Sequence, residues 1–314
     1  VYNGDNYLAE AVESALAQTY DNIEIIVIND GSIDGGATER VALSYGDRIQ
    51  YIKKENGGSS SALNVGIENM NGQWFSWLSH DDLYYPDKIE KQIKLLNNLL
   101  LQVGEGNIEN QVISCTSEII DSSGKKIYRP TNRKIKRELD IVNNYSNIEI
   151  VIEMLHNITF YGCGFLLPKS CFLKVGKFDE DLRLLNDIDY WFRLLRNGYK
   201  FHYVPKILVS QRIHKKQISH QIGFSYNNKE QDRFWDSIIN FVKNEDKNKS
   251  AEYLFRIGKY ALYKGRNKDS NKSFKYCLDL IPQYRFIVLF NRIYIPIYRI
   301  FRNYIKRLYL AIKL

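Results

Sequence analysis

Cysteine and proline are scarce in this sequence of 314 residues, and long uncharged segments are missing. The four cysteines, Cys115, Cys163, Cys171 and Cys277, are widely separated and form no Cys-x-x-Cys pair. Their spacing argues against a zinc ribbon and a disulfide framework, and it is typical of reduced, buried thiols in a cytosolic protein. No uncharged run approaches the ~20 residues of a membrane-spanning helix, which argues against a polytopic membrane protein.

Acidic residues are missing from the end of the chain. Residues 282–314 contain seven of the 44 Lys and Arg residues and none of the 36 Asp and Glu residues, so the remaining chain is nearly neutral. A nucleic-acid-binding body would need a basic face of its own to meet the phosphate backbone. The composition therefore argues against nucleic acid as a partner.

A strand is also missing before the first predicted helix. The sequence begins Val1-Tyr2-Asn3, and helix-spaced apolar residues follow at once over residues 5–18. We expect this sequence to lack the true N-terminus, together with the strand that would normally lie inside the sheet.

Short apolar runs then alternate with helix-spaced segments. Strands are predicted at residues 22–28, 49–53, 74–78 and 199–209, and helices at 34–45, 61–70, 87–101, 148–156, 169–175 and 187–197. Residues 107–137 have a strand-like pattern with a turn at Ser123-Gly124. This alternation predicts an α/β fold with a mostly parallel sheet that is covered by helices on both faces.

The sequence becomes polar and helical after about residue 220. Residues 251–282 resemble one helix pair of the tetratricopeptide kind, which cannot stand alone as a single repeat. We therefore predict two domains, one over residues 1–220 and a helical extension over residues 221–314.

Asp30 and Ser32 follow the predicted strand at 22–28, separated by Gly31. Ligands of parallel α/β sheets lie beyond the carboxyl ends of the strands, where a carboxylate can accept a hydrogen bond from a nucleobase N–H group. Alternatively, the two side chains only cap the next helix.

Asp81 and Asp82 follow an aromatic, apolar strand. Adjacent carboxylates at such a position are costly unless they are neutralised, and Mg²⁺ or Mn²⁺ would neutralise them and also bind the phosphates of a substrate. The alternative is a solvated turn whose acids cap the helix after Pro86.

Asp187 lies near the start of a predicted helix, two residues before Asp189. Residues at this spacing cannot share a helix face, so at most one of them points into a given cleft. We expect the exposed helix end to keep Asp187 ionised, which suits a general base. The alternative is an acid that only complements the helix dipole.

A basic stretch that includes Arg212 and His214 follows the strand at 199–209. It could close over a pyrophosphate, with His214 as an additional metal ligand or phosphate contact. Isolated histidines are more often plain surface or core residues, and His80 beside the two acids could be a bystander.

Seven segments, taken together and in order, carry a family resemblance. They are Tyr2-Asn3; Gln18-Thr19-Tyr20; Val27 to Asp34; Asn56 to Ile67; Asp81-Asp82 with Pro86 to Glu90; Val175 to Glu180; and Asn186-Asp187 with the loop that holds Arg212, His214 and Ser219. Over residues 1–220 the chain resembles the family 2 glycosyltransferases, which have the GT-A fold and transfer a sugar from a nucleoside diphosphate with inversion.

The resemblance implies roles for individual residues. Asp30 would hold the nucleobase, most often uracil, and Asp187 would deprotonate the acceptor hydroxyl. Asp81 would be the acid of the metal-binding motif, with Asp82 beside it and a divalent cation, Mn²⁺ or Mg²⁺, as cofactor. The other positions assigned to the nucleotide sugar are Tyr2, Ser32, Gly58, Asn64, Asp81 and Arg212, and the metal ligands are Asp81, Asp82 and His214.

Four positions depart from the family pattern. Ser79, Asn29 and Asn186 stand where acids are usual, and Leu63 stands where Arg is common. Ser79 and Asn186 suggest a rival interpretation, a non-catalytic relative that binds sugar nucleotides or acts as a scaffold. A sugar-nucleotide pyrophosphorylase is disfavoured because residues 1–5 lack a Gly-rich, basic phosphate loop.

Basic residues recur every seven positions in the tail, at Arg285, Arg292, Arg299, Lys306 and Lys313. At 100° per residue they form one slowly drifting stripe on a helix with many apolar residues, in which Pro296 predicts a kink. We expect residues 283–314 to lie on an anionic membrane surface, as suits a cytoplasmic enzyme at the inner face of the membrane with a glycan or lipid-linked acceptor. The alternative is a helix packed on the domain with solvated arginines.

Overall fold

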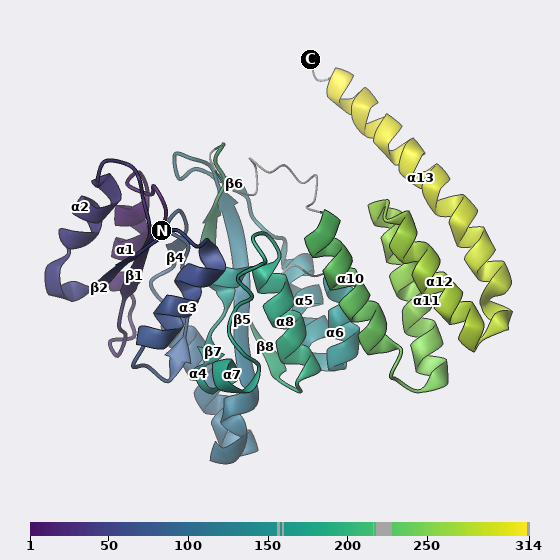
Figure 1. The fold of residues 1–314 in the computed structure, drawn as a ribbon, viewed down its shortest axis with the longest axis horizontal. Helices are drawn as coiled ribbons and strands as arrows, with labels where there is room; N and C mark the ends of the chain where they lie inside the picture. Colours follow the sequence, from purple (N-terminus) through teal and green to yellow (C-terminus); the bar gives the residue numbers. More distant parts are fainter. Residues whose placement is uncertain (156–157, 159, 216, 218–227, 313–314) are drawn as a thin grey trace. The chain divides into compact units, whose positions relative to one another are not determined.

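The computed structural model describes residues 1–155, 158, 160–215, 217 and 228–312. The chain forms two compact units (Figure 1). The first comprises residues 1–147 and 159–226, and the second comprises residues 148–158 and 227–314. The second unit thus includes a segment that the sequence assigned to the first domain.

One edge of the first unit is a parallel pair of strands. β1 (Ile26–Asp30) pairs with β2 (Gln50–Lys54), and Asp30 stands opposite Lys54. On the other side of β1, the Val1 carbonyl accepts a hydrogen bond from the Asp30 N–H at 2.8 Å. The pairing brings the end of β1 and the N-terminal residues together at one sheet edge.

The largest sheet of this unit has the order β4-β8-β5-β6. Its strands are β4 (Leu83–Tyr84), β8 (Lys200–Arg212), β5 (Gln111–Ile120) and β6 (Lys126–Tyr128). Only β5 and β8 are parallel, and β3 (Trp74–Phe75) pairs separately with β7 (Leu167–Pro168) in antiparallel fashion. The α/β fold is confirmed, but the strand pairing is more mixed than the sequence pattern indicated.

The helices of the first unit mostly match the predicted segments. They are α1 (Leu8–Leu16), α2 (Ala37–Leu43), α3 (Ser59–Asn69), α4 (Lys88–Val103), α5 (Asn132–Asn144), α7 (Ser170–Lys174) and α8 (Asn186–Arg196). α8 forms because Tyr190, Trp191, Leu194 and Leu195 are buried at helical spacing. Trp191 stacks on Phe165 with ring centres 3.7 Å apart, which fixes this helix to the core.

The second unit is helical. Its elements are α6 (Asn147–Met154), α10 (Asn228–Val242), α11 (Lys247–Lys264), α12 (Asn267–Leu280) and α13 (Arg285–Ile312). α11 and α12 form the predicted helix pair, and they approach so closely that a Cβ atom on Gly258 would lie 2.7 Å from the Phe274 ring. Gly265, with φ of +80°, ends α11 in the left-handed conformation that favours glycine.

α13 is one helix that contains Pro296. Its apolar residues and arginines are distributed along its length, as the sequence predicted. Within the described ranges, no helix combines the length and the low charge that crossing a membrane requires.

Candidate active site

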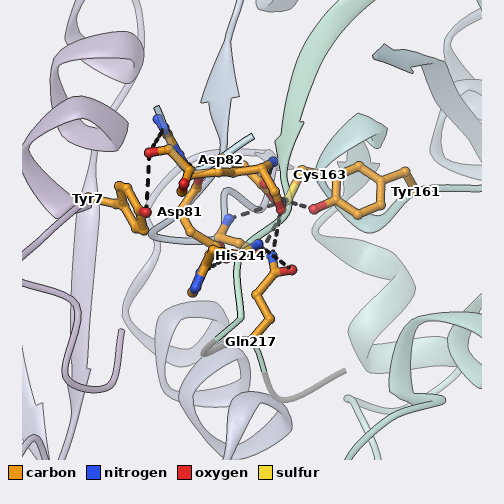
Figure 2. A network of polar contacts seen from close by, with 10 residues as sticks. Tyr7, Asp81, Asp82, Tyr161, Cys163, His214 and Gln217 are labelled. Atoms are coloured by element: carbon orange, nitrogen blue, oxygen red, sulfur yellow. Dashed lines mark hydrogen bonds and ion pairs between the residues drawn. The ribbon is translucent and has the colours of Figure 1, made fainter. Parts of the chain in front are cut away.

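A polar network surrounds the loop between β3 and β4, at the end of β8. Figure 2 shows Asp81 and Asp82 in its centre, together with Tyr7, Tyr161, Cys163, His214 and Gln217. β8 brings the 212–217 segment to this loop because its residues Val209 and Ser210 pair with β4 directly after Asp82. The network therefore joins two segments that are about 130 residues apart in the sequence.

Asp81 is buried, and one of its carboxylate oxygens is shared by two donors. Its Oδ2 lies 3.1 Å from His214 Nε2 and 2.8 Å from Gln217 Nε2. The His214 ring in turn packs at a tilt against Tyr7, with ring centres 5.2 Å apart. Asp81 and His214, which the sequence analysis assigned to one metal site, are thus direct neighbours.

Asp82 is fully buried and lies in a different environment. Its Oδ1 accepts a hydrogen bond from the Arg212 N–H at 2.9 Å, and its Oδ2 accepts from the Tyr161 hydroxyl and from Cys163 Sγ at 3.3 Å. Burial, reinforced by the neighbouring Asp81 charge, raises the pKa of Asp82 to about 7. Its contacts give Asp82 a structural role that the sequence prediction, a metal ligand, did not foresee.

Arg212 connects the network to α1. Only 1% of its surface is exposed. Its Nε donates to the Asp81 carbonyl at 2.9 Å, one terminal nitrogen donates to Glu10 at 2.7 Å, and its guanidinium lies over the Tyr7 ring at 4.4 Å. We predicted Arg212 as a phosphate contact from the sequence, but the structure uses its donors to hold the Asp81 backbone.

Asp30 holds the loop between β2 and α3. Its Oδ1 accepts from the Gly57 N–H at 2.9 Å and from Lys54 Nζ at 2.7 Å, and its Oδ2 accepts from the Gly58 N–H at 2.8 Å. A carboxylate oxygen has two lone pairs, so Oδ2 retains room for one further donor such as a nucleobase N–H. Asp30 does not cap the next helix, α2, because the N–H groups that it accepts from lie just before α3.

The remaining predicted sugar-nucleotide residues have separate environments. Tyr2 is exposed, and Ser32 Oγ accepts from the Asn3 N–H at 2.9 Å. Gly58 has φ of +88° and is the N-cap residue directly before α3. Asn64 is buried and binds Phe178 through both main-chain groups and Glu180 through its carboxylate, so its amide holds α3 to the 178–180 segment.

Asp187 lies in the first turn of α8, as predicted. Its Oδ1 accepts from the Ile188 N–H at 2.7 Å. Burial raises the pKa of Asp187 to about 6, so this helix end is less exposed than we expected from the sequence. Asp189 points elsewhere, toward Arg193 Nε at 2.7 Å, in agreement with the spacing argument.

Short links connect the surroundings of the three acids. The Gly58 N–H binds Asp30, and the next residue, Ser59, accepts from the Asn186 amide at 3.3 Å beside Asp187. On the other side, the Val1 carbonyl binds the Asp30 N–H, while a Cβ atom on Gly4 would lie 2.5 Å from the His80 ring beside Asp81. Asn186 thus links the neighbourhood of Asp187 to the loop that Asp30 binds, and Gly4 lies close to His80 beside Asp81.

The three-ligand metal site predicted at Asp81, Asp82 and His214 remains a prediction. Among the described residues, no group of three or more His, Cys, Asp or Glu side chains is placed to hold a metal ion. Both carboxylate oxygens of Asp82 already accept hydrogen bonds, Oδ1 from the Arg212 N–H and Oδ2 from Tyr161 and Cys163. Asp81 Oδ2 and His214 Nε2 are two adjacent atoms that can serve as metal ligands. They suit a cation that takes its other ligands from substrate phosphates.

Sequence reasoning missed several members of the network. Glu10, Tyr7, Tyr161, Cys163 and Gln217 have no motif, and they belong to the site only because the fold brings four separate segments together. Gln217 lies in the basic stretch that the sequence singled out, so its position was the one available signal.

Comparison with known proteins places the chain in a family. Residues 1–103 match the sequence model of Glycosyl transferase family 2. An uncharacterized glycosyltransferase of Rickettsia felis is 44% identical over 257 residues, which cover 81% of this chain and 40% of that protein. The minor teichoic acid biosynthesis protein GgaB of Bacillus subtilis is 29% identical over 253 residues, which cover 78% of this chain and 25% of GgaB.

The fold also resembles a solved structure. The crystal structure of S. aureus TarS 1-349 in complex with UDP-GlcNAc superposes with a TM-score of 0.59 at 15% identity, over 90% of this chain and 78% of that one. The present chain spans less than half the length of the Rickettsia felis relative. With the family match, the strong relatives and the shared fold, the chain belongs to glycosyltransferase family 2.

Proposed function

We propose that this chain transfers a sugar from a nucleoside diphosphate, preferably a UDP-sugar, to a hydroxyl group of a glycan or of a lipid-linked acceptor. Family membership and the likeness to the UDP-GlcNAc complex of TarS support the donor class. The likeness to a teichoic acid biosynthesis protein supports a cell-envelope polymer as the acceptor class.

The position of Asp187 in the first turn of α8 is the observation that carries the proposal. A carboxylate with a pKa near 6 is ionised at neutral pH and is a stronger base than an ordinary aspartate. Asp187 follows Asn186, whose amide contacts the start of α3 beside the Asp30-bound loop. We assign Asp187 as the base that takes the proton of the acceptor hydroxyl.

The reaction is a single displacement. The acceptor oxygen forms a bond to the anomeric carbon, the bond from that carbon to the diphosphate oxygen breaks, and its electron pair leaves with the diphosphate. Attack from the face opposite the leaving group inverts the anomeric centre. In this scheme Asp30 positions the nucleobase through its remaining acceptor site, and Arg212 keeps the Asp81 backbone in place.

A divalent cation, Mn²⁺ or Mg²⁺, belongs to the proposal. Asp81 Oδ2 and His214 Nε2 would hold it, and when bound it would neutralise the charge that develops on the departing diphosphate. Gln217 then has to release Asp81 Oδ2, which it contacts at 2.8 Å.

Substitution of the base tests the proposal. Asp187→Asn should lower turnover by about 10²–10⁴-fold, the usual contribution of general acid–base catalysis, with donor affinity little changed. Asp181→Asn is the matched control because Asp181 is an exposed acid shortly before α8. Donor affinity is measured by calorimetry across UDP-, GDP- and dTDP-sugars with Mn²⁺, and equal losses of affinity and turnover would contradict the base assignment.

One observation favours a second candidate, a relative that binds sugar nucleotides without turning them over. Ser79 replaces an acid and its N–H contacts Cys163, and both carboxylate oxygens of Asp82 accept hydrogen bonds from within the protein. Such a protein would bind UDP-sugar in the calorimeter but release no UDP with Mn²⁺ under any acceptor condition.

We propose in addition that the chain works at the inner face of a cell membrane. A lipid-linked acceptor would be presented there, and the predicted tail over residues 283–314 would supply the attachment. The absence of acids from this tail supports an anionic surface as partner.

A further inference from the structure

The exposed surface of α13 differs from the one that its sequence pattern suggested. The side of the helix toward the helix pair is fixed by Val288 and Ile295, which are buried with Leu262 and Phe274. At 100° per residue, Arg285, Arg292 and Arg299 lie within about 60° of that buried line. The arginine stripe therefore flanks the contact with α11 and α12.

Direct contacts agree with this placement. The Arg292 guanidinium lies 5.6 Å from the ring centre of Phe274 on α12, and the Arg299 guanidinium lies against Gly265 at the end of α11. The basic side chains are thus at the rim of the free surface and not at its centre.

The opposite side of α13 is apolar and open. Phe286 is 84% exposed and Phe290 is 61% exposed, although both are large aromatic residues. The outer face, as we call this set, consists of the exposed residues Phe286, Ile287, Leu289, Phe290, Ile293 and Tyr294. Phe290 stacks on Tyr294, with ring centres 5.5 Å apart, so the outer face is a continuous surface. A contiguous apolar surface of this kind marks an interaction site.

We infer that the outer face of α13 inserts into an anionic lipid surface, with Arg285 and Arg292 meeting the headgroups at its rim. Apolar and aromatic side chains on one face of a helix with cations beside them are the arrangement by which helices lie in a membrane interface. The complete lack of acids in residues 281–314 complements the negative charge of such a surface.

The same charges disfavour a second copy of this chain as the occupant. Two outer faces packed on each other would bring their flanking arginines together, and residues 281–314 offer no acid to pair with them. Like charges that face each other across an interface without a counter-charge oppose association. The inference rests on the membrane attachment proposed above and names the face of α13 that makes it, but it does not depend on the transfer reaction.

Vesicle sedimentation tests the inference with the full chain. The double substitution Phe290→Gln and Ile293→Gln should lower binding at least tenfold on vesicles of phosphatidylcholine with phosphatidylglycerol and also reduce the weaker binding on phosphatidylcholine alone. Both residues are exposed, so the variant should keep its circular dichroism spectrum and its donor turnover without vesicles. Leu173→Gln, at a position 90% exposed in the first unit, is the matched control and should bind like the unaltered chain.

A second variant separates the arginines from the apolar residues. Arg285→Gln with Arg292→Gln should weaken binding about tenfold only where phosphatidylglycerol is present. Unchanged binding of the Phe290/Ile293 variant would overturn the inference, because the outer face would then not touch lipid. Self-association would replace the inference if the unaltered chain did not bind vesicles and formed a dimer that the Phe290/Ile293 variant converted to a monomer.

Discussion

At the scale of single residues, Asp82 couples the stability of the fold to pH. Its pKa of about 7 in the folded protein lies above that of an unfolded aspartate, so the folded state holds a proton that the unfolded state releases between about pH 4 and pH 7. Asp82 therefore contributes stability that is fully present below pH 4 and is lost as the pH rises through 7.

Asp82→Asn should remove this dependence. The free energy of unfolding of the unaltered chain, minus that of the variant, should fall by at most about 1.4 kcal/mol per pH unit between pH 4 and 7 and then level off. Urea titrations at several pH values measure it. The subtraction also removes the contribution of His80, which is the same in both proteins. Its lowered pKa of about 4 makes the stability rise with pH, opposite to the effect of Asp82. A difference that is constant with pH would show that Asp82 is ionised in the folded state.

The raised pKa of Asp187 predicts that kcat/KM falls at acid pH. Since kcat/KM reports the free enzyme, its value should fall below about pH 6 as Asp187 becomes protonated and can no longer accept a proton. Steady-state rates with saturating Mn²⁺ and a fixed acceptor would reveal it. Asp187→Asn should abolish the limb together with most of the rate, whereas a limb that persists unaltered would assign it to another group.

Only part of this residue-level arrangement could be predicted. Asp81 with His214, and Asp187 at the start of α8, followed from motif positions that the sequence displays. The burial of Asp82 depends on Tyr161 and Cys163, which come from another part of the chain and have no local signature. Local sequence carries residue type and spacing, but the pKa depends on what long-range packing removes from water.

At the scale of elements, Asn64 clamps α3 to the segment before α8. Its amide makes hydrogen bonds with both main-chain groups of Phe178 and with Glu180. Asn64→Ala should lower the free energy of unfolding by about 2–3 kcal/mol, because each buried hydrogen bond contributes about 1 kcal/mol. Asn69→Ala, on the exposed end of the same helix, is the control for urea titration. Equal stability of the two variants would refute the clamp.

The elements differ in how well the sequence predicts them. α8 and the α11–α12 pair have apolar residues at helical spacing, and both were predicted. α5 was missed because it is very polar and lies in a segment with a strand-like pattern. Thr131, whose side chain accepts from the Lys134 N–H, was the available start signal for that helix.

α13 shows a different limit of sequence reasoning. Its seven-residue basic repeat was recognised, but the repeat alone does not say which side faces the protein. The side is decided by Val288 and Ile295, which fit against Leu262 and Phe274 of the helix pair. Tertiary packing selects one face of an amphipathic helix from several that are nearly as apolar.

At the scale of the whole molecule, the second unit is built from two separate pieces of chain. Glu153 of α6 is buried and binds Arg256 of α11 at 2.6 Å and Tyr260 at 3.3 Å. The interior residues Ile150, Val151 and Ile152 are at most 1% exposed. The predicted boundary near residue 220 therefore does not separate two continuous segments.

Truncation tests this arrangement. A chain that ends at residue 226 keeps α6 but loses α10 to α13, so we expect Glu153 to lose its contacts with Arg256 and Tyr260 and apolar side chains of α6 to become exposed. It should show a lower melting temperature and more aggregation than the full chain in light scattering. A chain that ends at residue 280, which keeps α11 and α12, is the comparison. Identical melting of the chain that ends at 226 would mean that α6 is stabilised within the first unit.

The two-piece construction also has a consequence during synthesis. α6 leaves the ribosome long before Arg256 and Tyr260 of α11 have been translated. During that interval α10 to α13 are not yet present to cover Glu153 and its apolar neighbours. We expect nascent chains in that interval to expose apolar side chains of α6, which favours aggregation with other unfinished chains. Slow codons between residues 158 and 227 would lengthen that exposure and lower the yield of native protein.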